Sequence, residues 1–198
     1  PVAGRSAAAE LKPIIISLDT VVDLLDPQAF RTFGAQTVTA SLYSSLLSQE
    51  FTTDADGAIV GTSVYGPGLA ESVEFSDDRL TVTFTLRTDA AFPDGSPITV
   101  DDVLWTFERS ILGPGYIKSL LPFIGIQSME QITRGDGDNT IVFTPSVASP
   151  LFERFIALQA FGIMQQRLGA ENATADDEWA FTFFRDNVGA SGPYTVTS

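Results

Sequence analysis

The alternation of apolar and polar residues is clearest between Leu80 and Arg87. Leu80, Val82, Phe84 and Leu86 alternate with three threonines and the arginine. This period of two is typical of a strand with one buried face. Threonine is β-branched and favours the same backbone conformation. We therefore predict a half-buried strand here.

A tight turn and a capped helix are predicted to follow this strand. In Phe92–Gly95 the proline presets its own φ, and the glycine can take the positive φ that a turn requires. Thr99 can cap a helix, with Asp102 as the acid of a capping box. Apolar residues over 100–111 follow helical spacing, and the Gly113-Pro114-Gly115 sequence ends the helix. Each of these residues has a structural role, so we place no catalysis here.

Other apolar runs predict further elements. The continuous run Ile14–Ile16 is typical of a strand buried on both faces. Residues 37–47 are mildly amphipathic and predict a short helix, and residues 151–158 show the same spacing. Residues 1–10 contain no hydrophobic signal segment, and we interpret them as a flexible leader.

Two acidic turns invite a calcium interpretation, which their spacing excludes. An EF-hand loop needs an oxygen ligand at its fifth position and a glutamate at its twelfth. Ala58 stands at the fifth position of the loop that starts with residues 54–57, and the loop starting with residues 136–139 lacks the glutamate. We predict hairpin turns instead, the second between short strands near Ile132 and Ile141–Phe143.

Composition narrows the classes of function. A chain of 198 residues can form one large or two small domains, and its 44% hydrophobic content is typical of a globular protein. The net charge of −14 arises from 25 acidic against 11 basic residues, a surface that repels nucleic acid. The acids are spread along the chain, which favours a solubilising surface.

The absence of two residue types removes several chemistries. The chain has no cysteine and no histidine, so it lacks disulfides, thiolate and Ser-His catalysis, and cysteine or histidine metal ligands. No run approaches the roughly 20 apolar residues of a membrane span. We predict no catalytic residue, no metal site and no cofactor.

Two motifs in the strand, turn and helix resemble the family-5 solute-binding proteins of ABC importers, which bind dipeptides, oligopeptides or nickel. The family signature reads much like F-x-L-R followed by F-x-D-G-x-P-x-x-A-x-D-V. It stands here as Phe84–Arg87 and Phe92–Val103, with Val100 in place of the usual alanine. This departure leaves the predicted helix intact.

Further family motifs occur in the same order along the chain. Leu25-Asp26-Pro27 is similar to L-D-P, and Tyr43–Leu46 to Y-E-x-L without its glutamate. Leu69–Ser72 resembles L-A-x-S/T-W, which precedes the first sheet strand of the family. Gly189–Tyr194 resembles G-T-G-P-Y, with Ala190 and Ser191 where the family has its first glycine and threonine. The resemblance covers nearly the whole chain, but family members are considerably longer.

The resemblance implies an α/β (α+β) fold, a type II periplasmic-binding-protein lobe with an additional antiparallel-sheet subdomain and an incomplete second lobe. Residues 1–47 would form the first segment of the ligand-binding lobe. Residues 48–185 would form the inserted subdomain, and residues 186–198 would return to the first lobe. The second lobe would follow the G-P-Y motif.

The implied function is capture of a solute for an ABC importer. In this family the ligand lies between two lobes that close on it, and the closed form is presented to the membrane permease. We therefore expect a periplasmic or extracytoplasmic binding protein for peptides or similar small solutes, with a membrane-anchored form as one possibility. It would be no enzyme, and nucleic acid would be no partner.

The resemblance also implies contributors to the ligand site from the first lobe, and the missing lobe would supply others. These residues are Leu18, Asp19, Arg31, Phe33, Gln36, Tyr43, Tyr116, Gln159 and Phe161. Each has an alternative role. Tyr43 is also a core candidate, Phe33 and Phe161 can fill interior space, and Arg31 can be a surface charge.

Two other functions are weighed against solute binding. An acid-pair hydrolase needs two carboxylates at a defined separation, whereas Asp101 and Asp102 point about 100° apart on a helix. A stand-alone interaction module would bind a partner strand at a sheet edge. Turnover of a substrate would support the hydrolase, and binding of proteins only would support the module.

Overall fold

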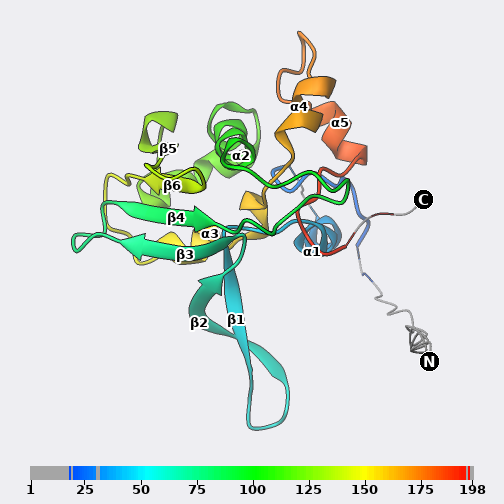
Figure 1. The fold of residues 1–198 in the computed structure, drawn as a ribbon. Coiled ribbons are helices and arrows are strands. Elements are labelled where there is room, and N and C mark those ends of the chain that lie inside the picture. The colour runs from blue at the N-terminus through cyan, green and yellow to red at the C-terminus, as the bar shows by residue number, and fades with distance from the viewer. Residues whose placement is uncertain (1–17, 19, 30–31, 195, 197–198) are drawn as a thin grey trace, which may run out of the picture.

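The predicted strand is β4, the second strand of a four-stranded antiparallel sheet in the order β3-β4-β6-β5 (Figure 1). The computed structural model describes residues 18, 20–29, 32–194 and 196. The predicted leader and the strand predicted over 14–16 lie outside the described residues. The strands of this sheet are β3 (Ala70–Phe75), β4 (Val82–Leu86), β5 (Ile132–Arg134) and β6 (Thr140–Phe143).

The side chains of β4 alternate between the core and the opposite face, as the period of two predicts. Val82, Phe84 and Leu86 are buried, and the two threonines between them are half-buried. Phe84 is paired with Val73 on β3 and with Ile141 on β6. The strands predicted near Ile132 and Ile141–Phe143 are confirmed as β5 and β6, which pair in antiparallel register.

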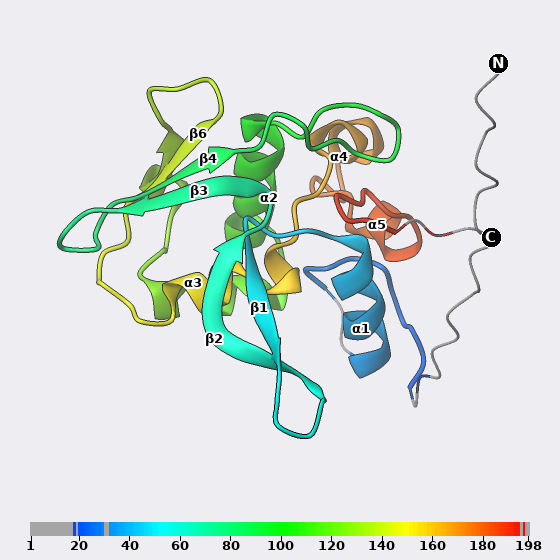
Figure 2. The same cartoon turned by 60° about the horizontal axis from the view of Figure 1, so that its bottom comes forward.

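The predicted capped helix is α2 (Val100–Leu112), which lies across one face of the sheet (Figures 1 and 2). Thr99 and Asp102 form the expected capping box, and the helix ends before Gly113. Phe107 on α2 packs edge-on against Phe143 of β6, with ring centroids 5.0 Å apart. The preceding turn is also confirmed, with Gly95 at φ +84°.

The helix predicted over 37–47 is displaced toward the N-terminus. It is α1 (Phe33–Leu42), and its first turn is capped by the Thr32 side chain. Leu46 is buried in the main core beyond the helix, and Leu47 begins β1 (Leu47–Thr53). The predicted end was wrong because the apolar spacing continues after the chain has left the helix.

β1 forms a hairpin with β2 (Ile59–Pro67), confirming the turn predicted at residues 54–57. The hairpin projects away from the rest of the molecule (Figures 1 and 2). The L-A-x-S motif was expected before the first sheet strand, but Ala70 already begins β3.

Shorter helices and 3-10 turns complete the fold. The helices are α3 (Phe152–Ile156), α4 (Gln166–Asn172) and α5 (Phe181–Asp186), and the turns are η1 (Tyr116–Ser119), η2 (Leu121–Ile124), η3 (Met129–Gln131) and η4 (Gln159–Phe161). Only α3 was predicted. A second, smaller core joins the end of α1 to α5, with Leu42, Tyr43 and Phe184 among its members. No helix in the described ranges is long and apolar enough to cross a membrane.

Candidate functional site

The predicted ligand residues fall into separate places in the structure. Phe33 and Gln36 lie on the first turns of α1, and Tyr116 begins η1. Leu18 is half-buried. Asp19 and Arg31 lie outside the described residues.

Phe33 is held outward by the way the N-terminal segment contacts α1. Thr32 donates from Oγ1 to the Val21 carbonyl at 2.8 Å, and the Gly34 amide donates to Thr20 Oγ1 at 2.7 Å. A Cβ on Gly34 would lie 2.7 Å from the Thr20 carbonyl oxygen, so the close approach requires glycine. The side chain of Phe33 remains 67% exposed.

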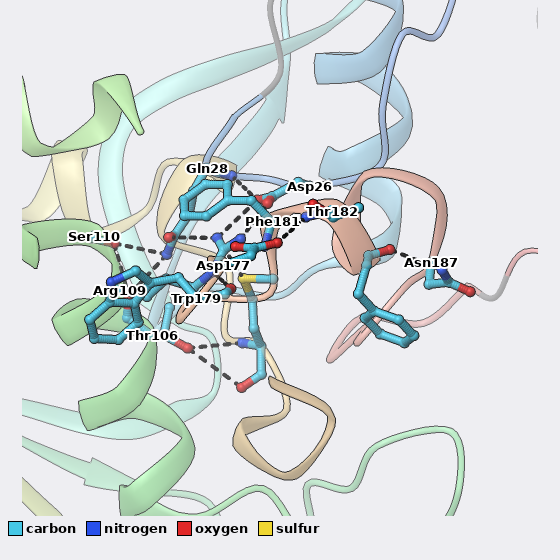
Figure 3. Close-up of polar contacts among 12 residues, drawn as sticks. Asp26, Gln28, Thr106, Arg109, Ser110, Asp177, Trp179, Phe181, Thr182 and Asn187 are labelled. Atoms are coloured by element: carbon cyan, nitrogen blue, oxygen red, sulfur yellow. Dashed lines mark hydrogen bonds and ion pairs between the residues drawn. The ribbon is translucent and has the colours of Figure 1, made fainter. Parts of the chain in front are cut away.

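A buried ion pair fixes this N-terminal segment to α2 (Figure 3). The guanidinium of Arg109 donates to Asp26 through Nη1–Oδ1 at 3.1 Å and Nη2–Oδ2 at 2.5 Å. Both side chains are at most 1% exposed. Gln28 accepts from Arg109 Nη1 and donates to the Ser110 hydroxyl. We call Asp26, Gln28 and Arg109 the clasp.

The clasp also holds the segment before α5. Arg109 Nε donates to the Trp179 carbonyl at 2.9 Å, and its Cζ lies 3.7 Å from the centroid of the Phe181 ring. This is a desolvated cation–π contact.

Asp177 lies just before α5. Partial burial acts to raise the pKa of Asp177, but hydrogen bonds from the Thr182 and Phe181 amides outweigh it and hold this pKa below its ordinary value.

Tyr116 lies beside the clasp. A Cβ on Gly115 would lie 3.0 Å from the carbonyl oxygen of Gln28, so the backbone before Tyr116 packs closely on the clasp. The ring of Tyr116 is 44% exposed, and its partial burial raises the pKa of its hydroxyl. The clasp therefore sets where the backbone before Tyr116 lies relative to residues 20–29.

A groove of about 680 Å³ lies on another part of the molecule, between the β1–β2 hairpin and the end of α1. Of the predicted residues, Tyr43 and Gln159 line it. Residues 191–193 form part of its wall, and Ser191 Oγ accepts from the Ser44 amide at 3.0 Å. Arg87 and Asp89 form an exposed ion pair at its rim.

Tyr43 and Phe161 are buried, so the structure favours the alternative role of core residues for both. Phe161 is fully buried and stacks on Phe107 with centroids 5.7 Å apart. Tyr43 is 3% exposed, and its hydroxyl makes no well-formed hydrogen bond among the described residues, although the backbone of Gly189 lies near enough to act against the rise in its pKa. Burial, with the Asp26 charge as a second cause, raises the pKa of Tyr43.

The carboxylates considered for hydrolysis have structural partners. Asp101 is paired with Arg134, and Asp102 completes the capping box and accepts from the Gln166 amide. Within the described residues, no group of three or more acidic, histidine or cysteine side chains could hold a metal ion.

Sequence reasoning did not find the clasp. Its signal is present, because Arg109 occurs at helical spacing with Asp102 and Thr106 on a buried side of α2. A charged residue on an apolar helix face requires a buried partner.

Comparison with known proteins places these features in a family. The model of bacterial extracellular solute-binding proteins, family 5 Middle, matches residues 64–198. The probable D,D-dipeptide-binding periplasmic protein DdpA of Escherichia coli K12 is 31% identical over 199 residues, which cover 100% of this chain and 35% of the relative.

Two solved structures illustrate the likeness. The periplasmic binding protein DppA of Helicobacter pylori, in complex with the peptide STSA, is 21% identical and has the same fold, with a TM-score of 0.62 over 79% of this chain and 31% of that protein. AgaA of A. tumefaciens R10, in complex with agropinic acid, is 29% identical, with a TM-score of 0.59 over 77% of this chain and 28% of that protein. The chain thus spans about a third of the length of these relatives.

Proposed function

We propose that this chain, which belongs to the bacterial extracellular solute-binding proteins of family 5, is the N-terminal part of the peptide-capturing component of an ABC importer. The match of the family model over residues 64–198 carries this proposal. The family is one of solute-binding proteins and not of enzymes. Relatives named as dipeptide- and peptide-binding proteins support peptides as the solute.

We propose that the solute contacts Phe33 and Gln36 on α1 and Tyr116 on η1. Exposed aromatic rings supply large contact area at low entropic cost, which suits a wall that a second lobe closes on. Leu18, Asp19 and Arg31 are further candidates. The clasp holds the two parts of this wall in register.

The division into lobes is also part of the proposal. Residues 1–47 and 186–198 would belong to the ligand-binding lobe, and residues 48–185 to the inserted subdomain. The contact between the Gly192 amide and the Leu42 carbonyl, at 2.8 Å, supports this division. The closed form would deliver its solute to a membrane permease from the periplasm or another extracytoplasmic space.

A second class of solute is favoured by one relative. AgaA was solved with agropinic acid and is 29% identical to this chain. Agropinic acid, or a similar small acid, is therefore the alternative ligand, taken by the same mechanism of enclosure.

Calorimetric titration of the protein expressed from its complete reading frame tests the proposal, with tripeptides and agropinic acid as probes. We expect micromolar or tighter binding of one probe, and a loss of about tenfold or more in affinity for the Phe33→Ala and Tyr116→Ala variants. Phe123→Ala is the matched control, because this exposed ring lies on η2. Equal affinities for all four proteins would remove these residues from the site, and native mass spectrometry would show any solute retained from the cell.

A further inference from the structure

The groove follows the outer edge of β1. Four residues of β1 line it (Leu47, Ser48, Gln49 and Phe51), whereas β2 contributes Pro67 at the base of the hairpin. β1 and β2 form a sheet of two strands, so in the described part of the chain the outer edge of β1 has no strand partner. Natural proteins usually cover such an edge, because its free amides and carbonyls pair readily.

The hairpin that carries this edge also exposes large apolar side chains. Phe51 is 66% exposed, Ile59 78% and Val64 52%. A two-stranded hairpin is marginally stable in water, and this one projects from the body of the molecule (Figure 2). An apolar surface beside an open strand edge marks an interface.

The opposite wall of the groove identifies the occupant. It is formed by the end of α1 and by Ser191–Pro193, a few residues before position 198. Relatives such as DdpA are about three times as long as this chain. We propose that, in the complete protein, polypeptide following residue 198 lies in this groove and pairs with the outer edge of β1.

Two other occupants fit the groove less well. A second copy would bring together two hairpins whose residues 47–67 contain three acids and no basic residue, on chains of net charge −14. A captured solute is disfavoured because the exposed aromatic candidates, Phe33 and Tyr116, do not line the groove.

Thiol labelling tests the proposal cleanly, because the chain has no cysteine. Ser48→Cys and Phe51→Cys probe the groove, and Asp138→Cys is the control on the exposed turn between β5 and β6. Each variant is labelled with a maleimide, both as the 198-residue chain and as the protein expressed from its complete reading frame. We expect labelling at 48 and 51 to slow by about tenfold or more in the complete protein, because a covered thiol reacts only when the cover opens. The rate at 138 should not change.

Several other outcomes of the labelling experiment would overturn the proposal. Equal rates at 48 in both proteins, or a reading frame that stops at 198, would leave the groove open. Protection of the 198-residue chain that grows with protein concentration would identify a second copy as the occupant. Protection that requires added trialanine would identify a solute. A complete protein that binds no solute but protects position 48 would contradict only the proposed function, so the two failures are distinguishable.

Discussion

Removing one partner of the buried ion pair should destabilise the protein strongly. In Asp26→Ala the guanidinium of Arg109 stays buried and loses both of its hydrogen bonds to the carboxylate. Breaking a fully buried pair costs about 3–5 kcal/mol, because the remaining charge is uncompensated. For a protein of this length the melting temperature should fall by about 6–20 °C.

Equilibrium unfolding in urea measures this cost. The two tryptophans, Trp105 and Trp179, report on it directly, because one ring lies 6.0 Å from the Arg109 guanidinium and the other residue accepts a hydrogen bond from it. The control is Asp186→Ala, which breaks a pair whose side chains are 60% and 63% exposed. This exposed pair should contribute at most about 1 kcal/mol.

The double variant Asp26→Leu, Arg109→Met shows how much of the cost of Asp26→Ala comes from leaving one charge buried without its partner. Replacing both charges by apolar side chains removes the desolvation penalty, so the double variant should be more stable than Asp26→Ala. A free energy of unfolding for Asp26→Ala within about 1 kcal/mol of wild type would refute the reasoning, since it would mean that the site admits water or a counter-ion.

Three further changes test the core, a buried hydroxyl and a turn. Phe92→Ala should cost about 3–5 kcal/mol, because this ring is buried in the main core, and an unchanged urea midpoint would contradict that role. Tyr43→Phe should raise the free energy of unfolding by up to about 1–3 kcal/mol, because it removes a buried hydroxyl without a described partner; a loss of stability would reveal a bound water. Hydrogen bonds from Ser96, and to a smaller extent from Gln165, lower the pKa of Asp94 in the folded protein. The ionised Asp94 therefore contributes its full stabilisation above the ordinary carboxyl pKa, and this stabilisation is lost as the pH falls toward the lower pKa of the folded state. Urea midpoints measured from pH 5 to pH 2 should therefore fall less for Asp94→Asn than for wild type, and parallel curves would show that the pKa is unshifted.

The elements that could be predicted from the sequence depend on residues close together in the chain. The capping box joins Thr99 to Asp102, and the turn before it needs only Pro93 and Gly95. The pairing of β5 with β6 follows from a connection of five residues, 135–139. Each of these signals is complete within a few residues, so no distant contact can change it.

The elements that were missed depend on distant contacts. α1 ends at Leu42 because Leu46 is drawn into the main core and β1 pairs with β2, neither of which the helical spacing shows. α5 has no side-chain cap, since the residue before it is Ala180 at φ 51°. Its start depends on the Asp177 carboxylate, which accepts from the Phe181 and Thr182 amides.

The residues of the candidate site stay a prediction, and the structure adds which of their side chains a ligand can reach. The motifs named Phe33 and Tyr116, and in the structure both are exposed, where a ligand can reach them. They also named Phe161, which the core uses, because a motif gives the position of an aromatic residue and not the direction of its ring.

The buried polar residues of α2 show what a sequence can still indicate about distant contacts. Asp102, Thr106, Arg109 and Ser110 lie at helical spacing on the buried side of the helix. Each contacts another part of the chain: Asp102 accepts from the Gln166 amide, Thr106 from the Met164 amide, Arg109 donates to Asp26 and Trp179, and Ser110 accepts from Gln28. Burying such a group without a partner would cost about 1–3 kcal/mol if it is neutral and more if it is charged. Buried polar residues along one side of a helix therefore predict that distant segments meet there, and in this protein one of those segments, with Asp26 and Gln28, leads to the helix that carries Phe33 and Gln36.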